Sequence, residues 1–397
     1  MNKLNISKRV DGIVESPIRK FFPLVKKAES EGVEFIKLNV GDPDILPPSE
    51  ILQGISGFSG PNVCYAPSPG MRDHISSWIK YYLDFNISVS EDNIQITQGA
   101  GEAILMSIMS VADAGDEILI FEPFYTNYKS IAQLCDVRLV AVTLKMENKY
   151  EMPTDSEIVS KISDKTKAIV LINPDTPTGK IWSESEIERI IKIASDNNLF
   201  IISDETYREI YFADKPKSLL EFESARDRAI VIDSLSKRFS VPGLRVGAIV
   251  SRNDELIASV RKIAMSRLSV NTIGQVCTNK ILRDSTAYTS QIRQEYKKRS
   301  DALCRGLAKI DGVDFLPAMG AFYQIVRLPV EDSEEFVKYL VNDFRHNNKS
   351  VLVAPMEDFY ITKNMGNNEI RIANVQTEKK LIEAVEILKL ALENKKK

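Results

Sequence analysis

Polar side chains directly follow several short apolar runs of this 397-residue sequence, and at two of these places a lysine or a carboxylate could take part in chemistry. Lys237 comes after the apolar run 229–233, with two serines just before it. An amine placed where a sheet binds ligands can form a Schiff base with a carbonyl compound. Asp204 comes after the run 199–203, and a carboxylate at a buried strand end needs a cationic partner. Taken alone, Lys237 could be a surface lysine and Asp204 a helix cap.

A third place could bind an anion. The turn Gly99–Gly101 follows the apolar run 93–97 and opens a predicted helix. Small residues let backbone N–H groups approach a phosphate, and the helix dipole favours negative charge there. Arg245 could hold the same anion. A simple tight turn explains the glycines equally well, and a dinucleotide-binding loop is a rival, because Glu122 lies about twenty residues further on.

The elements that must position these groups alternate between strand and helix over residues 90–250. Apolar, β-branched runs predict strands covered on both faces, and 183–198 has the pattern of an amphipathic helix. We therefore expect an α/β fold with a doubly wound, mostly parallel sheet, in which ligands bind beyond the carboxyl ends of the strands. We expect residues 46–288 to form this large domain, residues 289–397 a small C-terminal α+β domain, and residues 1–45 a segment that joins the small domain.

Composition argues against several functional classes. The chain has 52 basic and 55 acidic residues and a formal net charge of −3, which predicts no binding to nucleic acid or to a membrane surface. The four cysteines show no paired spacing, as expected for a cytoplasmic protein without disulfides. Only His74 and His346 occur, so we expect no histidine-rich metal site and interpret both as ordinary surface or capping residues.

An aldehyde-capturing lysine, a phosphate cradle and an acid for a pyridinium nitrogen together indicate pyridoxal phosphate. With these features the sequence resembles the class I and II aminotransferases, the aspartate aminotransferase-like enzymes of fold type I. The resemblance extends from SPIRKFF and NVGDPDI near the start through SDETY and SLSKRFSVPGLRVG to EIRIANV near the end. It implies an aminotransferase that acts on an α-amino acid and a 2-oxo acid, with glutamate and 2-oxoglutarate as one expected pair. It also implies a homodimer with active sites shared across the interface.

The resemblance also implies roles for individual residues. Lys237 would form the Schiff base and move the proton, Asp204 would contact the ring nitrogen, and Tyr207 would donate to the ring 3′-oxygen. Arg371 would grip the substrate carboxylate through its planar fork, and Gly41 would let the substrate pass close to the backbone. The other implied cofactor contacts are Ala100, Gly101, Tyr125, Asn173, Thr176, Ser234, Ser236, Arg245 and, reaching the neighbouring subunit's phosphate, Tyr65.

Thr176 departs from the family pattern. The family usually has NPxNPTG, whereas this chain has NPDTPTG, so a shorter hydroxyl replaces an amide that donates to the 3′-oxygen. Losing that donor would destabilise the ring phenolate. Two interpretations stay open. The substitution is tolerated because Tyr207 still donates, or the chain is a same-fold pyridoxal enzyme of another class, catalysing β- or γ-elimination or cyclisation of an amino acid side chain.

Two other functions are weaker alternatives. A pyridoxal-sensing regulator would need an added DNA-binding region, and the sequence shows no basic arm. A nicotinamide-dependent oxidoreductase rests only on the Gly99–Gly101 turn and Glu122. The resemblance implies that the segment of Arg267 approaches the partner subunit's site, so Arg267 is either a reader of a substrate side-chain carboxylate there or a surface residue. Five aromatic residues could form an apolar wall near the site or belong to the core: Phe21, Phe22, Phe322, Tyr323 and Phe359.

Overall fold

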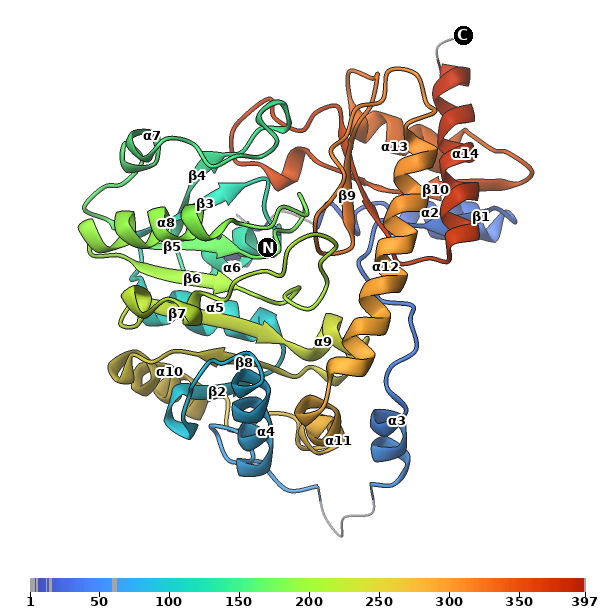
Figure 1. The fold of residues 1–397 in the computed structure, drawn as a ribbon. Coiled ribbons are helices and arrows are strands. Elements are labelled where there is room, and N and C mark those ends of the chain that lie inside the picture. The colour runs from blue at the N-terminus through green and yellow to red at the C-terminus, as the bar shows by residue number, and fades with distance from the viewer. Residues whose placement is uncertain (1–3, 5, 12, 14–15, 59–62, 396–397) are drawn as a thin grey trace.

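The computed structural model describes the chain apart from residues 1–3, 5, 12, 14–15, 59–62 and 396–397. Its centre is a seven-stranded sheet with the order β2-β8-β7-β6-β5-β3-β4 (Figure 1). The strands are β2 (Ile94–Thr97), β3 (Glu117–Glu122), β4 (Arg138–Thr143), β5 (Thr166–Ile172), β6 (Phe200–Asp204), β7 (Ala229–Ser234) and β8 (Gly247–Val250). Only β8 runs antiparallel to its neighbours. The predicted α/β fold with a doubly wound, mostly parallel sheet is confirmed.

Helices cover both faces of this sheet, which explains why its strands are apolar along their whole length. In β7, Ile230 and Ile232 pack into one hydrophobic cluster and Val231 into another on the opposite face. The first face is covered by α5 (Ala100–Val111), α6 (Asn127–Leu134) and α10 (Asp254–Ser266), and the second by α4 (Arg72–Leu83) and α8 (Glu184–Asp196). This two-sided burial fixes the sheet as a rigid base for the residues that follow each strand.

The two ends of the chain build a second, smaller unit. Its core joins side chains of residues 21–38 to side chains of residues 303–392. It contains the parallel pair β1 (Glu34–Lys37) and β10 (Lys349–Leu352), and a sheet of β9 (Tyr323–Arg327), β11 (Ala354–Pro355) and β12 (Glu369–Ala373). Its helices are α2 (Phe22–Ser30), α13 (Ser333–Asn342) and α14 (Glu378–Lys395). A small domain made by both chain ends is confirmed, whereas its limits at 45 and 289 stay a prediction.

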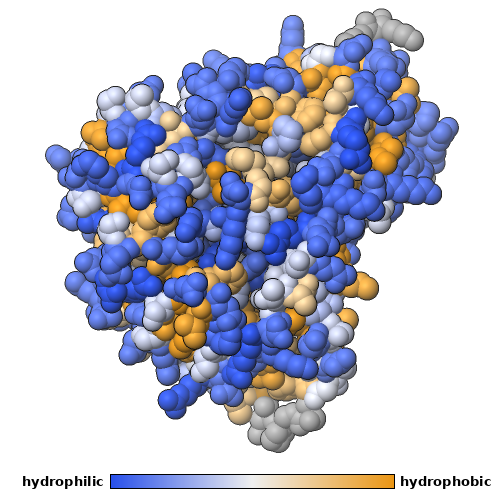
Figure 2. Space-filling view, viewed as in Figure 1, coloured by the Kyte–Doolittle hydropathy of each residue, from blue (hydrophilic) through white to orange (hydrophobic). Residues whose placement is uncertain are grey.

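The long helix α12 (Thr286–Leu307) leads from the large sheet domain to the small domain, where it packs along α14 (Figure 1). The remaining helices are α1 (Lys8–Asp11), α3 (Ser49–Ser56), α7 (Asp155–Val159), α9 (Leu235–Arg238) and α11 (Thr272–Arg283). Within the described residues no helix is long and apolar enough to cross a membrane. The face seen in Figure 2 is mainly hydrophilic, and its apolar side chains form small patches between charged ones.

The interpretation of His74 as a surface residue is wrong. Its side chain is fully buried, with Nδ1 2.8 Å from Asn279 Oδ1 and with Nε2 accepting a hydrogen bond from Trp78 Nε1 at 3.1 Å. Burial lowers the pKa of His74 to about 4, so the ring stays neutral and acts as a structural acceptor. No cluster of three or more potential metal ligands occurs in the described part of the chain.

Candidate active site

A cavity of about 380 Å³ opens where the central strands end. This is the edge at which doubly wound sheets bind ligands, and the volume lies in the range of small-molecule sites. The structure brings most of the sequence-predicted residues to its wall: Gly41, Ala100, Gly101, Tyr125, Thr176, Asp204, Tyr207, Ser234, Ser236, Lys237, Arg245 and Arg371. Asn173 and Tyr65 are not in the lining.

Lys237 supplies a buried amine to this cavity. It lies in the short helix α9, immediately after β7, and its Nζ donates a hydrogen bond to the carbonyl oxygen of Gly41 at 2.6 Å. Burial is the main cause that lowers the pKa of Lys237. A lowered pKa raises the neutral fraction of the amine, which is the form that attacks a carbonyl and accepts a proton. The geometry therefore supports nucleophilic and general-base chemistry at this atom.

Asp204 places a buried carboxylate at the end of β6. Its Oδ1 accepts from the Thr206 backbone N–H at 3.1 Å and its Oδ2 from the Tyr128 hydroxyl at 3.2 Å. Burial raises the pKa of Asp204, and the nearby carboxylate of Asp233 adds to the effect. None of the ion pairs found among the described residues involves Asp204. A buried, oriented carboxylate without a cation is a place where a positively charged ring nitrogen would be stabilised.

Gly41 and two tyrosines form the wall beside the lysine. The Tyr207 hydroxyl donates to the Tyr323 hydroxyl at 3.0 Å, and burial raises the pKa of Tyr207. A Cβ at position 41 would lie 2.6 Å from Tyr323 Cζ and 3.0 Å from Phe322 Cε2. Real Cβ atoms essentially never approach other atoms as closely as the first of these. Glycine is therefore required here because an aromatic side chain occupies the space.

A corner suited to an anion lies at the start of α5. Gly99 has φ +74°, a backbone conformation that favours glycine, and a Cβ there would lie 2.8 Å from Arg245 Nη2. The Arg245 guanidinium is held by the carbonyl oxygens of Gln98 and Pro242, both at 3.1 Å. The Ser234 hydroxyl donates to the Ser236 hydroxyl at 2.9 Å. A helix N-terminus, a guanidinium and hydroxyls together suit a phosphate group.

Arg371 presents a fixed guanidinium from β12. It is 1% exposed, and its Nη2 donates to the Asn39 carbonyl oxygen at 2.6 Å. The guanidinium carbon lies 4.2 Å from the Tyr323 ring centroid and 5.0 Å from that of Phe359. Its Nε finds no hydrogen-bond partner among the described residues. A buried, stacked guanidinium with spare donors suits a substrate carboxylate.

Thr176 and Asn173 differ in what they offer a ligand. The Thr176 hydroxyl is buried in the cavity wall and has no hydrogen-bond partner among the described residues. The Asn173 side chain instead donates to the Lys217 carbonyl oxygen at 2.9 Å and accepts from the Trp182 backbone N–H at 3.3 Å. Thr176 is thus free to donate to a bound ring oxygen, whereas Asn173 shapes the loop that carries it.

Glu122 and Arg267, for which the sequence left a ligand-binding role open, have protein groups as partners. Glu122 accepts from the backbone N–H groups of Ile361 and Thr362, at 2.6 and 3.2 Å, so its carboxylate holds the small domain and is not free for a ribose hydroxyl. Arg267 Nε donates to Glu102 at 3.1 Å and is absent from the cavity lining. Glu122 therefore does not support a dinucleotide site, whereas the role of Arg267 at a partner subunit's site stays a prediction.

Several side chains at the site were not singled out from the sequence. Tyr128 lies one helical turn after Tyr125 at the start of α6, and that spacing is the signal that could have revealed it. Arg19, Lys129 and Asp358 reach the cavity from separate segments, and no local pattern marks them. Among the aromatic candidates, Phe21, Phe322, Tyr323 and Phe359 are buried, Tyr323 also lines the cavity, and Phe22 is exposed.

The side chains present fit pyridoxal phosphate. The buried amine of Lys237 can capture its aldehyde, the corner at Gly99 and Arg245 can hold its phosphate, and Asp204 can pair with its ring nitrogen. The buried, unpartnered Thr176 hydroxyl can donate to its ring oxygen.

Comparisons with known proteins point the same way. The family model "Aminotransferase class I and II" matches residues 33–388. An aspartate aminotransferase of Pyrococcus horikoshii is 28% identical and covers 99% of both chains. A probable aspartate aminotransferase of Methanocaldococcus jannaschii is 32% identical, over 80% of this chain and 83% of its own. Among solved structures, an aspartate aminotransferase from Thermotoga maritima has a TM-score of 0.89 and 25% identity, covering 98% of this chain and 100% of its own.

Proposed function

The chain belongs to the class I and II aminotransferase family, and from this premise we propose that it exchanges amino groups between a small α-amino acid and a 2-oxo acid, with glutamate and 2-oxoglutarate as one pair. Membership makes it a pyridoxal phosphate-dependent enzyme. The observation that carries the proposal is the buried Lys237 amine, which shares one cavity with Asp204 and Arg371.

Each residue has a distinct task in this proposal. Bound pyridoxal phosphate acts as the electron sink that makes the α-proton of an amino acid acidic. Lys237 accepts that proton at Nζ and returns it at a neighbouring carbon. Asp204 keeps the ring nitrogen positively charged, since an adjacent carboxylate favours the cation. Arg371 holds the substrate carboxylate by a two-point contact, which orients the α-carbon toward Lys237.

Two further cations at the cavity support a substrate pair in which both the amino acid and the 2-oxo acid carry a second carboxylate. Arg19 and Lys129 line the cavity, and no ion pair joins either of them to a carboxylate within the described residues. Asp358, the acid beside them, is engaged by Lys20 at 3.3 Å. A second carboxylate, as in glutamate or 2-oxoglutarate, would balance these charges. The names of similar proteins include aspartate, alanine and kynurenine aminotransferases, so the partner amino acid stays open.

We also propose a homodimer in which Tyr65 reaches the partner's phosphate corner. Tyr65 is 82% exposed and lies outside the cavity of its own chain. The adjacent Cys64 carbonyl accepts from the Thr272 hydroxyl at 2.9 Å, which places this loop beside α11. Light scattering should give a dimer. Tyr65→Phe should weaken cofactor binding without changing the dimer mass.

The test of the function is direct. Borohydride reduction of cofactor-loaded enzyme followed by peptide mapping should find the cofactor on Lys237, and a panel of amino donors with 2-oxoglutarate should yield glutamate. Pyruvate, or an amine retained in a cyclised product, would instead support the alternative reaction classes. For Thr176, a pH titration of the cofactor absorbance should differ between wild type and Thr176→Asn, and identical titrations would remove the special role of Thr176.

Two other proposals rest on the sequence. If the predicted domain limits at 45 and 289 are right, structures with and without bound substrate should differ by a rigid-body movement of residues 46–288 relative to the rest of the chain. Cell fractionation tests the proposed cytoplasmic location.

A further inference from the structure

An ion pair brackets the turn that carries the lysine. Asp233 lies at the end of β7 and Arg238 at the end of α9, so the turn between them holds Ser234, Ser236 and Lys237. Arg238 Nη2 lies 2.8 Å from Asp233 Oδ1 and 2.9 Å from Asp233 Oδ2. Arg238 is 1% exposed and Asp233 is 0% exposed. The pair therefore ties the two ends of the turn together in the interior of the protein.

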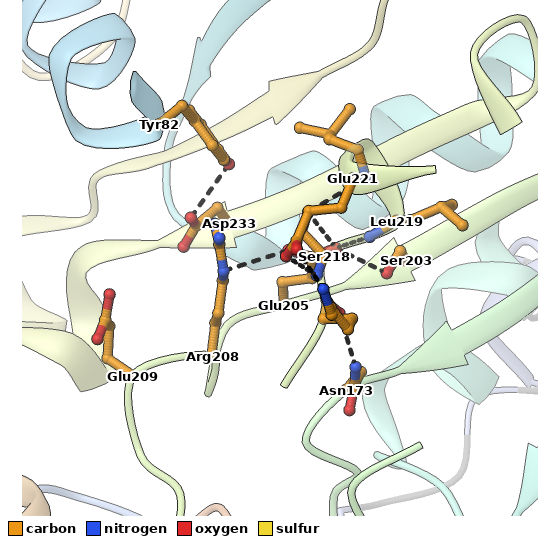
Figure 3. A network of polar contacts seen from close by, with 12 residues as sticks. Tyr82, Asn173, Ser203, Glu205, Arg208, Glu209, Ser218, Leu219, Glu221 and Asp233 are labelled. Carbon is orange, nitrogen blue, oxygen red and sulfur yellow. Dashed lines mark hydrogen bonds and ion pairs between the residues drawn. The ribbon is translucent and has the colours of Figure 1, made fainter. Parts of the chain in front are cut away.

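Other contacts fix both partners. The Ser234 backbone N–H donates to Asp233 Oδ1 at 2.6 Å. Tyr82 of α4 donates to Asp233 Oδ2 at 3.2 Å, and Figure 3 shows it pointing at this carboxylate. The Arg238 guanidinium carbon lies 4.0 Å from the ring centroid of Tyr81, also on α4. Helix α4 thus holds the pair in place against the turn.

The pair does not touch the cavity. Ser234, Ser236 and Lys237 line the cavity, whereas Asp233 and Arg238 do not. The pair therefore acts on the phosphate and the aldehyde through the turn. Its other route is the charge of Asp233 near Asp204, which faces the ring nitrogen and affects pyridoxal and pyridoxal phosphate alike. Helix α9 is a single turn of four residues, which is too short to be stable alone and needs anchors from outside.

The neighbouring ion pair of Glu205 and Arg208 has a longer separation and no direct hydrogen bond. Glu205 and Arg208 enclose Thr206 and Tyr207 in the same way, with Asp204 just before them, but Arg208 Nε lies 3.9 Å from Glu205 Oε2 (Figure 3). No nitrogen of the Arg208 guanidinium has a hydrogen-bond partner among the described residues. Direct hydrogen bonding across a catalytic turn is thus a feature of the Asp233–Arg238 pair and is absent from its neighbour.

We propose that the Asp233–Arg238 ion pair is a clamp that positions the turn so that the Ser234 and Ser236 hydroxyls face the cofactor phosphate and the Lys237 amine faces its aldehyde. The proposal rests on the pyridoxal phosphate enzyme argued above. Both residues are positioning residues, because neither lines the cavity. Replacing this buried pair with apolar groups need not destabilise the protein, whereas removing one partner leaves a buried charge unpaired.

The experiment compares binding of pyridoxal phosphate and of pyridoxal, which lacks the phosphate, to cofactor-free protein by equilibrium dialysis. The dissociation constant of pyridoxal divided by that of pyridoxal phosphate gives a ratio that isolates the contribution of the phosphate. In Arg238→Met this ratio should fall about tenfold or more, the effect of losing one hydrogen bond to a charged group. Arg238→Lys, which keeps a cation near Asp233, should lie between Arg238→Met and wild type.

Two controls separate positioning from general stability. Glu117→Gln alters a carboxylate that is only 4% exposed and ion-paired with Arg138, but at the amino end of β3, far along the strand from the cavity. It should lower the melting temperature and leave the ratio unchanged. If Arg238→Met does not fold, the double variant Asp233→Asn/Arg238→Met removes both charges and should fold with the same low ratio.

An unchanged ratio in the folded Arg238 variants, or an equal loss of affinity for both ligands, would overturn the clamp. A wild-type protein that binds neither ligand would instead contradict the proposed function. The two failures are therefore distinguishable.

Discussion

Replacing Gly41 by alanine should damage stability and substrate binding together. The new Cβ would lie 2.6 Å from Tyr323 Cζ and closer still to its hydroxyl, so the end of the ring must move by roughly 1.5 Å to restore ordinary contact. That movement breaks the 3.0 Å hydrogen bond between the Tyr207 and Tyr323 hydroxyls. It also disturbs the ring on which Arg371 stacks at 4.2 Å.

The size of the effect follows from these contacts. Overpacking in a dense region costs about 1–3 kcal/mol, and a lost hydrogen bond adds about 1 kcal/mol. A displacement of about 1 Å at a residue that orients the substrate lowers kcat/KM by about a hundredfold. Thermal unfolding of cofactor-free protein measures the first effect, and steady-state kinetics with two substrates measures the second.

A matched control and a rescue sharpen this test. Gly243→Ala introduces the same methyl group at a position where a Cβ meets nothing within 4 Å, so it should change neither quantity. Adding Tyr323→Phe to Gly41→Ala removes the nearest atom and should recover part of both losses. The reasoning fails if Gly41→Ala melts like wild type and keeps its kcat/KM.

Three further predictions follow from the site and the core. Lys237→Ala should abolish turnover and the covalent cofactor link, and a mass spectrum after borohydride that still shows a bound cofactor would contradict the assignment. Arg371→Ala should raise KM about a hundredfold for both substrates, since it removes a two-point contact to the carboxylate, while cofactor affinity stays unchanged. His74 is neutral in the folded protein, with a pKa of about 4 against 6.5 for the free side chain. As the pH falls, His74 is therefore protonated in the unfolded chain near pH 6.5 but in the folded protein only near pH 4. The free energy of unfolding should fall by about 3 kcal/mol as the pH drops from 6.5 to 4. His74→Gln should flatten this pH dependence in denaturant titrations, and an unchanged slope would refute it.

The sequence alone indicated the residues that follow the strands. Apolar, β-branched runs marked where β6 and β7 end, and this local pattern was enough to place Asp204 and Lys237 at one edge of the sheet. The glycine turn at the start of α5 marked the anion corner for a similar local reason. These predictions succeed because strand formation and tight turns depend mainly on residues close together in the chain.

Side-chain directions and distant contacts were decided by the tertiary structure. The sequence could not show that Asn173 turns toward Lys217 while Thr176 faces the cavity, although the two are three residues apart. It also could not show that His74 is buried against Asn279 or that Tyr128 bonds Asp204. Such facts depend on which helix packs on which strand, because burial and hydrogen-bond partners arise from segments far apart in the chain, and only the completed packing of both domains brings those segments together.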